Sequence, residues 1–392
     1  MATKVFLHVG LPKSGTTYLQ AVLGENKQRL QERARVLYPG RTWSDQVHAA
    51  RDVLSADPHG SRSEATQGAW GRLVDEVAAW DGDAVVSMEW LGSASPEQAR
   101  RMVDTLSPAT TEVVVTARDL GRTVPAAWQE FMQNWEQWTW PEFLRSISSE
   151  NPRATNAGNL FWIQQDLGRL IAIWRDVVPA ERIHVVTLPR PGSSAGELWS
   201  RFASVLGTEP GLFDASGRGS NESLGLESAE LMRRLNDVCR LRGVEWPLYD
   251  DAFKHVLAKG VLAKRKNVES TLAVPEEYHD WVRSKAAEMK RAVLASGVHL
   301  VGDIDDLDPV FPPGGMQPED VGADAMLEAA LEGLVGMARA RDRVRKRLRA
   351  AEAGPGRPPV RTRIVELGDR NAAVRRALDV YRAGRRTVRR AP

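Results

Sequence analysis

The chain has 392 residues, of which 42% are hydrophobic and 27% charged, and its formal net charge is +2. The ordinary apolar fraction excludes a fibrous protein, and the length is sufficient for one large domain or two modest ones. No apolar stretch approaches the roughly twenty residues that span a bilayer, and the N-terminus enters an apolar strand pattern without a charged leader. We therefore expect a soluble, cytoplasmic protein. The single cysteine, Cys239, excludes an intrachain disulfide, and we expect it to pack in the core.

Apolar runs rich in Val or Ile predict four buried parallel strands, at residues 5–9, 84–87, 112–117 and 182–188. Helical spacing of apolar residues predicts helices that mostly follow these strands, at residues 16–30, 124–133, 160–177 and 195–206. This alternation is typical of an α/β protein in which helices cover both faces of a parallel sheet. Ligands of such sheets bind beyond the carboxyl ends of the strands, so residues there are the first candidates for a site.

The sequence beyond residue 302 differs in composition from the part before it, first in its Asp, Pro and Gly content and then in its basic residues. Residues 223–242 and 268–294 predict two more helices, and residues 302–318, rich in Asp, Pro and Gly, predict a boundary. We therefore expect one domain over residues 1–310 and a basic, helical and partly disordered tail over residues 319–392. Residues 339–392 hold eighteen Lys or Arg against five Asp or Glu. We expect this tail to be solvated, with contact to an anionic surface as the alternative, and we expect no specific nucleic-acid binding.

The most informative motif is GLPKSGTT at residues 10–17, between the first predicted strand and the first predicted helix. Two glycines five residues apart, followed by Thr16 and Thr17 at the start of a helix, are typical of a loop whose backbone N–H groups bind an anion. A nucleotide-triphosphate loop has its lysine directly after the second glycine, where this chain has Thr16. The lysine of this chain, Lys13, lies inside the loop instead.

This arrangement resembles the 5′-phosphosulfate loop of sulfotransferases that use 3′-phosphoadenosine 5′-phosphosulfate (PAPS), with the pattern P-K-[SA]-G-T-[ST]-x-[LV]. The residues from Pro12 to Leu19 fill every position of that pattern, and the first three-quarters of the chain is similar to the bacterial carbohydrate-sulfotransferase-like group. The resemblance implies a three-layer, P-loop-NTPase-like sheet, PAPS as co-substrate and no metal. It also implies that the donor 5′-phosphate is bound by Pro12, Lys13, Ser14, Gly15, Thr16 and Thr17.

Sulfuryl transfer needs a cation at the leaving phosphate. Lys13 is the candidate, because an ammonium beside the bridging oxygen stabilises the charge that develops as the S–O bond breaks. The alternative for Lys13 is an ordinary surface lysine in an ion pair. Arg118 ends the third predicted strand, and a planar guanidinium suits a phosphate; the alternative is an arginine that caps the edge of the sheet.

The resemblance assigns Arg118 to the donor 3′-phosphate, together with a serine eight residues later. Position 126 is alanine here, so either Thr123 replaces that serine or the second ligand comes from elsewhere. Arg218, in a glycine-containing turn, is a candidate for the late basic element that these enzymes close over the 3′-phosphate. An ordinary loop that leads to a helix cap is the alternative for that turn.

Glu89 follows the second predicted strand and is the candidate general base, provided that partial burial raises its pKa toward neutrality. A carboxylate that caps the next helix is the alternative interpretation. His48 is the alternative base, while His8 lies in the first strand and is expected to face the core. Trp138 and Trp140 are candidates for an acceptor cleft, and Trp128 is expected in the core.

The sequence thus predicts transfer of a sulfuryl group from PAPS to a hydroxyl, or an amine, of a small-molecule or carbohydrate acceptor such as a glycolipid. A P-loop kinase or NTPase on the same fold is one alternative, although it predicts a lysine at position 16, where the chain has Thr16. A non-catalytic binding protein that acts through its basic tail is the other. No cluster of His, Cys and Asp at ligand spacing predicts a metal site.

Overall fold

The structure is a computed structural model, and it describes residues 2–56, 64–194, 196–216 and 223–352. The chain divides into two compact units, Met1–Met337 and Ala338–Pro392. All the predicted site residues belong to the first unit. Residues 353–392, most of the predicted tail, lie outside the described residues, as does Arg218. No described helix is both long and apolar enough to cross a membrane.

A six-stranded sheet in the order β2-β3-β1-β4-β5-β6 forms the centre of the first unit. All five pairings are parallel, as a sheet built from strand–helix alternation requires. The strands are β1 (Lys4–His8), β2 (Val36–Leu37), β3 (Asp83–Ser87), β4 (Thr110–Ala117), β5 (Ile183–Thr187) and β6 (His299–Val301). The predicted parallel α/β sheet is confirmed. Strand β1, which leads into the GLPKSGTT loop, lies between β3 and β4.

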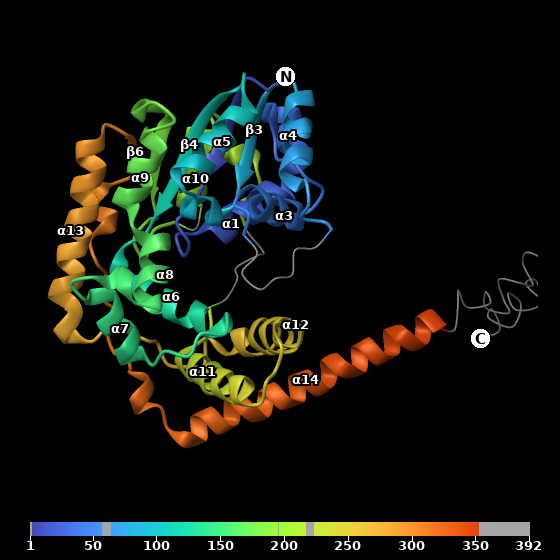
Figure 1. Ribbon diagram of the computed structural model, residues 1–392, viewed down its shortest axis with the longest axis vertical. Helices are drawn as coiled ribbons and strands as arrows, with labels where there is room; N and C mark the ends of the chain where they lie inside the picture. The colour runs from blue at the N-terminus through green and yellow to red at the C-terminus, as the bar shows by residue number, and fades with distance from the viewer. Residues whose placement is uncertain (1, 57–63, 195, 217–222, 353–392) are drawn as a thin grey trace, which may run out of the picture. The chain divides into compact units, whose positions relative to one another are not determined.

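Helices cover both faces of this sheet (Figure 1). Side chains alternate between the two faces along each strand. Phe6, Val85 and Val114 pack on one face with helices α1 (Thr16–Glu25) and α10 (Glu197–Val205). The other face carries Leu7 and Val86, and it packs against α4 (Ala69–Ala79), α5 (Pro96–Leu106), α6 (Leu120–Gln133), α9 (Leu167–Arg175) and α13 (His279–Ser296). The three-layer arrangement is therefore confirmed.

Further helical segments complete the first unit and continue from it. The longer ones are η1 (Leu30–Ala34), η2 (Glu89–Ser93), α3 (Trp43–Val53), α7 (Trp140–Ser148), α8 (Asn156–Gln165), α11 (Leu226–Leu241), η6 (Tyr249–Lys259) and α14 (Ala323–Glu352). The short ones are α2 (Lys27–Arg29), η3 (Pro152–Ala154), η4 (Ala180–Arg182), η5 (Pro210–Leu212), α12 (Trp246–Leu248), η7 (Leu262–Arg265), η8 (Glu276–Tyr278), η9 (Ile304–Leu307) and η10 (Pro318–Asp320).

Two predicted helices differ from the structure for local reasons. The helix predicted over residues 160–177 is two helices. Asp166 separates them, because its carboxylate accepts a hydrogen bond from the Arg169 N–H and so forms the N-cap of α9. The helix predicted over residues 268–294 begins only at His279, after Pro275. Strands β2 and β6 were not predicted, because two and three residues are too few to show a periodic pattern.

Candidate functional site

The GLPKSGTT loop connects the carboxyl end of β1 to the N-terminus of α1. Three of its residues have left-handed backbone, Gly10 with φ 116°, Lys13 with φ 66° and Gly15 with φ 86°. A Cβ atom at Gly15 would also collide with Leu198, so this position requires glycine. Gly15 caps α1 without a side-chain hydrogen bond. The first N–H groups of α1 therefore lack a capping side chain, and together with the helix dipole they favour an anion.

A buried polar network joins this loop to the strands β1, β3 and β4. The His8 ring on β1 lies 2.7 Å from the Ser87 hydroxyl on β3 and 3.1 Å from the Thr116 hydroxyl on β4. Thr116 in turn lies 2.6 Å from the Ser14 hydroxyl, which donates to the Leu11 carbonyl. Burial lowers the pKa of His8 to about 3, so its ring is neutral at ordinary pH. His8 faces the core as predicted, and the Ser14 hydroxyl is buried in the same network.

Lys13 forms an ion pair with a residue that the sequence did not single out. Its ammonium lies 2.9 Å from a carboxylate oxygen of Glu130 on α6, and the side chains are 20% and 41% exposed. Burial alone would raise the pKa of Glu130, but the charge and hydrogen bond of Lys13, with the charges of Lys259 and Lys254, lower it. Glu130 is thus a carboxylate held among three lysines.

The two further lysines reach this region on helix η6. The Tyr249 hydroxyl at the start of η6 donates to the Met132 carbonyl at 3.3 Å and lies 2.6 Å from the Asn236 side-chain oxygen. These contacts hold η6 against α6, which carries Glu130. Lys254 forms an ion pair with Asp250 at 3.3 Å. Nothing in the sequence around η6 signals this placement, because it depends on packing between elements that are over a hundred residues apart.

Glu89 is the first residue of η2, directly beyond β3. The Gln20 side chain of α1 donates to the Glu89 carboxylate at 2.9 Å and to the Ser87 carbonyl at 3.3 Å. Burial raises the pKa of Glu89, and the negative charge of Glu130 adds to this, whereas Gln20 and Lys13 oppose it. On balance the pKa of Glu89 is raised, the direction that a general base requires near neutral pH.

Arg118 lies at the carboxyl end of β4, beside the loop. One of its Nη atoms donates to the Lys13 carbonyl at 3.3 Å. Its Nε is buried and has no hydrogen-bond partner among the described residues. Burial, with the charge of Arg122, lowers the pKa of Arg118 to about 10, so the guanidinium stays charged at neutral pH.

Two further unpartnered donors follow at the N-terminus of α6. In the described part of the chain, six buried side-chain nitrogen or oxygen atoms have no hydrogen-bond partner, and three of them are Arg118 Nε, Arg122 Nη2 and Thr123 Oγ1. Asp119 caps the same helix through the Arg122 N–H. A buried donor without a partner costs about 1–3 kcal/mol. Three such groups lie within residues 118–123, and the Arg122 guanidinium also pairs with Asp119 through its Nε at 2.5 Å. An oxyanion that reached these groups would satisfy them.

The remaining candidates lie elsewhere. His48 on α3 is half-buried, and its ring lies 3.0 Å from the Thr66 hydroxyl. Trp140 is 1% exposed in the core, so its predicted place in an acceptor cleft is wrong. Trp138 is half-buried and packs on Phe143, with 6.4 Å between the ring centroids. Trp128, at 0% exposed, is in the core as predicted, and so is Cys239.

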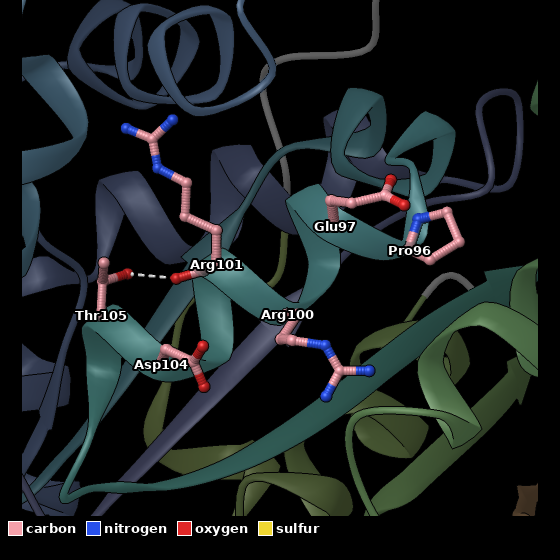
Figure 2. A pocket seen from close by; sticks show the side chains of 6 residues that line it. All are labelled: Pro96, Glu97, Arg100, Arg101, Asp104 and Thr105. Carbon is pink, nitrogen blue, oxygen red and sulfur yellow. Dashed lines mark hydrogen bonds between the residues drawn. The ribbon is translucent and has the colours of Figure 1, made fainter.

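A shallow hollow of about 350 Å³ lies along the outer face of α5 (Figure 2). Its lining residues are Pro96, Glu97, Arg100, Arg101, Asp104 and Thr105, all from that one helix. It contains no predicted site residue. In the described ranges, no three His, Cys, Asp or Glu side chains are gathered so that they could hold a metal ion.

No family model and no curated protein matches the chain. Among solved structures, the chain is similar to a sulfotransferase from Alicyclobacillus acidocaldarius, with 16% sequence identity and a TM-score of 0.38 over 62% of this chain and 97% of that one. The function is therefore inferred from the residues of this chain itself.

Proposed function

We propose that this protein transfers a sulfuryl group from PAPS to a hydroxyl of a small-molecule acceptor. The observation that carries the proposal is the set of buried donors on Arg118, Arg122 and Thr123 that have no hydrogen-bond partner among the described residues. Arg118 also contacts the loop that holds Lys13. In this proposal, two anion-binding positions lie at the carboxyl ends of the strands β1 and β4, which are adjacent in the sheet. PAPS carries negative charge at both its 5′ and its 3′ end, and so fits two such positions.

Each end of the donor has its own set of ligands in this proposal. The 5′-phosphate is bound by the backbone of the loop and by Thr16 and Thr17 at the start of α1. The 3′-phosphate is bound by Arg118, Arg122 and Thr123. Thr123 supplies the hydroxyl that the resemblance would place at position 126, and Arg122 is a ligand that the sequence did not indicate.

The reaction is an in-line displacement at sulfur. The acceptor oxygen forms a new bond to sulfur, and the bond between sulfur and the bridging oxygen of the 5′-phosphate breaks. Glu89 takes the proton of the acceptor hydroxyl, which its raised pKa favours. Lys13 stabilises the negative charge on the departing phosphate. The products are a sulfated acceptor and adenosine 3′,5′-bisphosphate.

Calorimetry with adenosine 3′,5′-bisphosphate, adenosine 5′-monophosphate and ATP–Mg²⁺ tests the proposal. We expect the bisphosphate to bind at least tenfold more tightly than the other two, because only it satisfies both anion positions. Arg118→Gln should abolish most of this preference, whereas Arg100→Gln on the outer face of α5 should preserve it. Tight binding of ATP–Mg²⁺ without binding of the bisphosphate would overturn the proposal and favour a kinase.

A further inference from the structure

Two tryptophans are conspicuous because their rings face solvent. Trp43 is 50% exposed and Trp90 is 37% exposed. Every other aromatic side chain in the described part of the first unit is buried or half-buried. Exposure of an indole ring to water is unfavourable. Single exposed apolar residues scattered over a surface are nevertheless common and need no explanation. These two are not scattered, because Trp90 directly follows Glu89 in the chain and Trp43 contacts Gln20, which contacts Glu89.

Each ring is connected to Glu89 in its own way. Trp90 follows Glu89 in η2. Trp43 starts α3, and its indole N–H donates to the Gln20 side-chain oxygen at 2.9 Å. The amide nitrogen of the same Gln20 donates to the Glu89 carboxylate at 2.9 Å. The proposed base is thus linked to one exposed ring by its backbone and to the other through a single glutamine.

An arginine accompanies the second ring. The Arg51 guanidinium lies 5.4 Å from the centroid of the Trp90 ring. Among the described residues, Arg51 forms no ion pair, so its charge is available to a bound anion. Arg51 and Trp43 are both on α3, eight residues apart, which corresponds to about 12 Å along the helix axis. This surface, made of Trp43, Trp90 and Arg51, is longer than one sugar ring.

We propose that Trp43, Trp90 and Arg51 bind the acceptor, and that the acceptor is a carboxylate-bearing oligosaccharide. This inference rests on the proposed sulfuryl transfer at Glu89. A sugar ring has a C–H face that packs on a flat indole and a hydroxyl edge that hydrogen-bonds to polar neighbours. A carboxylate on the sugar would pair with the Arg51 guanidinium. A hydroxyl of a ring held between these groups then lies beside Glu89.

The polar surroundings favour this acceptor over a lipid. An acyl chain needs an enclosed apolar channel, whereas Arg41, Thr42 and Ser44, which flank Trp43 in the chain, are exposed polar residues. Gln20 and Glu89 provide hydrogen-bonding groups close to the rings. A charged sugar suits this combination of two exposed indole rings, a guanidinium that forms no ion pair among the described residues, and nearby polar groups. This surface replaces the cleft predicted at Trp138 and Trp140.

The test measures binding of defined tetrasaccharides to the full-length chain saturated with adenosine 3′,5′-bisphosphate. Hyaluronan and oligogalacturonate fragments are the carboxylated probes, and chitotetraose and cellotetraose are the neutral ones. We expect a carboxylated probe to bind at least tenfold more tightly than the neutral ones. The Trp43→Ala/Trp90→Ala variant should lose at least tenfold of that affinity, and Arg51→Gln should lose most of the preference for the carboxylated probe. Trp80→Ala, at the end of α4, is the matched control and should bind normally.

Further measurements separate the causes of any loss. Circular dichroism and bisphosphate affinity should be unchanged in the double variant, which excludes misfolding. Trp43→Phe keeps a ring but loses the N–H bond to Gln20, so it should bind the sugar within about threefold of wild type. The inference is overturned if no saccharide binds, if the double variant binds the sugar as well as wild type, or if vesicles of anionic phospholipid bind instead. Tryptophan-dependent sugar binding without bisphosphate binding would refute the proposed function but not this sugar surface.

Discussion

The Lys13 ammonium lies 2.9 Å from the Glu130 carboxylate, so the cation proposed for catalysis already has a partner within the protein. A phosphate that binds Lys13 must compete with this partner. Lys259 and Lys254 also act on Glu130, and they can keep its charge compensated when Lys13 turns to the donor. The ion pair therefore sets part of the free energy of donor binding, and it places a second carboxylate next to Glu89.

Replacement of Glu130 should strengthen donor binding. In Glu130→Gln, Lys13 no longer has to leave an anionic partner. Partly exposed ion pairs contribute about 0.2–1 kcal/mol, which corresponds to an increase of up to about fivefold in affinity for adenosine 3′,5′-bisphosphate. Calorimetry at low and high salt measures this, and the gain should shrink as salt screens the pair. Glu97→Gln, on the exposed face of α5, is the control; weaker binding by Glu130→Gln would contradict the prediction.

Replacement of Lys13 should abolish turnover without unfolding the protein. Lys13 has a left-handed backbone with φ 66°, and asparagine tolerates that conformation better than most residues do. Lys13→Asn should therefore keep a melting temperature close to that of wild type. Its kcat should fall by about 10²–10³-fold, the usual loss when a group that stabilises developing charge is removed. Assay of sulfuryl transfer and thermal melts measure the two effects, and a low melting temperature would assign Lys13 a structural role instead.

Thr123 offers a test in which stability and binding move in opposite directions. Its hydroxyl is buried and has no partner among the described residues. Thr123→Val therefore removes an unsatisfied polar group and should leave the free energy of unfolding unchanged or raise it by about 1 kcal/mol. The same change should weaken binding of adenosine 3′,5′-bisphosphate by about tenfold and leave adenosine 5′-monophosphate unaffected.

Thr111 is the matched control for Thr123. Its hydroxyl on β4 is also buried and without a partner, yet it lies toward the opposite end of that strand from Arg118. Thr111→Val should therefore change stability in the same direction and leave bisphosphate binding as it is. Equal binding by Thr123→Val and wild type would remove Thr123 from the proposed 3′-phosphate site.

Local sequence patterns were sufficient to predict the parallel sheet and the shape of the loop. Strand β1 and the loop that follows it are determined by residues close together in the chain. These are an apolar run, glycines at left-handed positions and the start of a helix. Strand-end positions also placed Glu89 and Arg118 correctly at the edge where the loop lies, because parallel strands bring their carboxyl ends together.

Residues that reach the site through packing of distant helices could not be predicted in this way. Glu130 is near the end of α6, and it meets Lys13 only because that helix passes the loop. Lys259 approaches on η6, whose position depends on the Tyr249 hydroxyl. The same limit explains the wrong expectation for Trp140, because its burial comes from contacts with other elements and not from its own segment.

The raised pKa of Glu89 predicts where activity is lost on acidification. A general base works in its ionised form, so kcat should fall as the pH drops through the pKa of Glu89, above the value of an ordinary glutamate. Two variants should shift the pH at which kcat falls in opposite directions. Gln20→Met removes a hydrogen bond that favours the ionised form of Glu89 and should shift this pH upward. Glu130→Gln removes a like charge and should shift it downward. If neither variant shifts the pH profile of kcat, Glu89 is not the base.

His8 predicts how the stability of the fold depends on pH. Burial lowers its pKa in the folded chain to about 3, against about 6.5 in an unfolded chain. Below pH 6.5 the unfolded chain binds a proton that the folded chain does not, so the stability that His8 contributes is complete above that pH and is lost as the pH falls toward 3. The loss is about 1.4 kcal/mol per pH unit at most. Urea unfolding of wild type and His8→Gln at pH 7.5, 5.5 and 4.5 measures it, with His48→Gln as the control. Between pH 7.5 and pH 4.5, the difference in free energy of unfolding between wild type and His8→Gln should narrow by up to about 2.7 kcal/mol. A difference that does not change with pH would show that the ring is not held neutral.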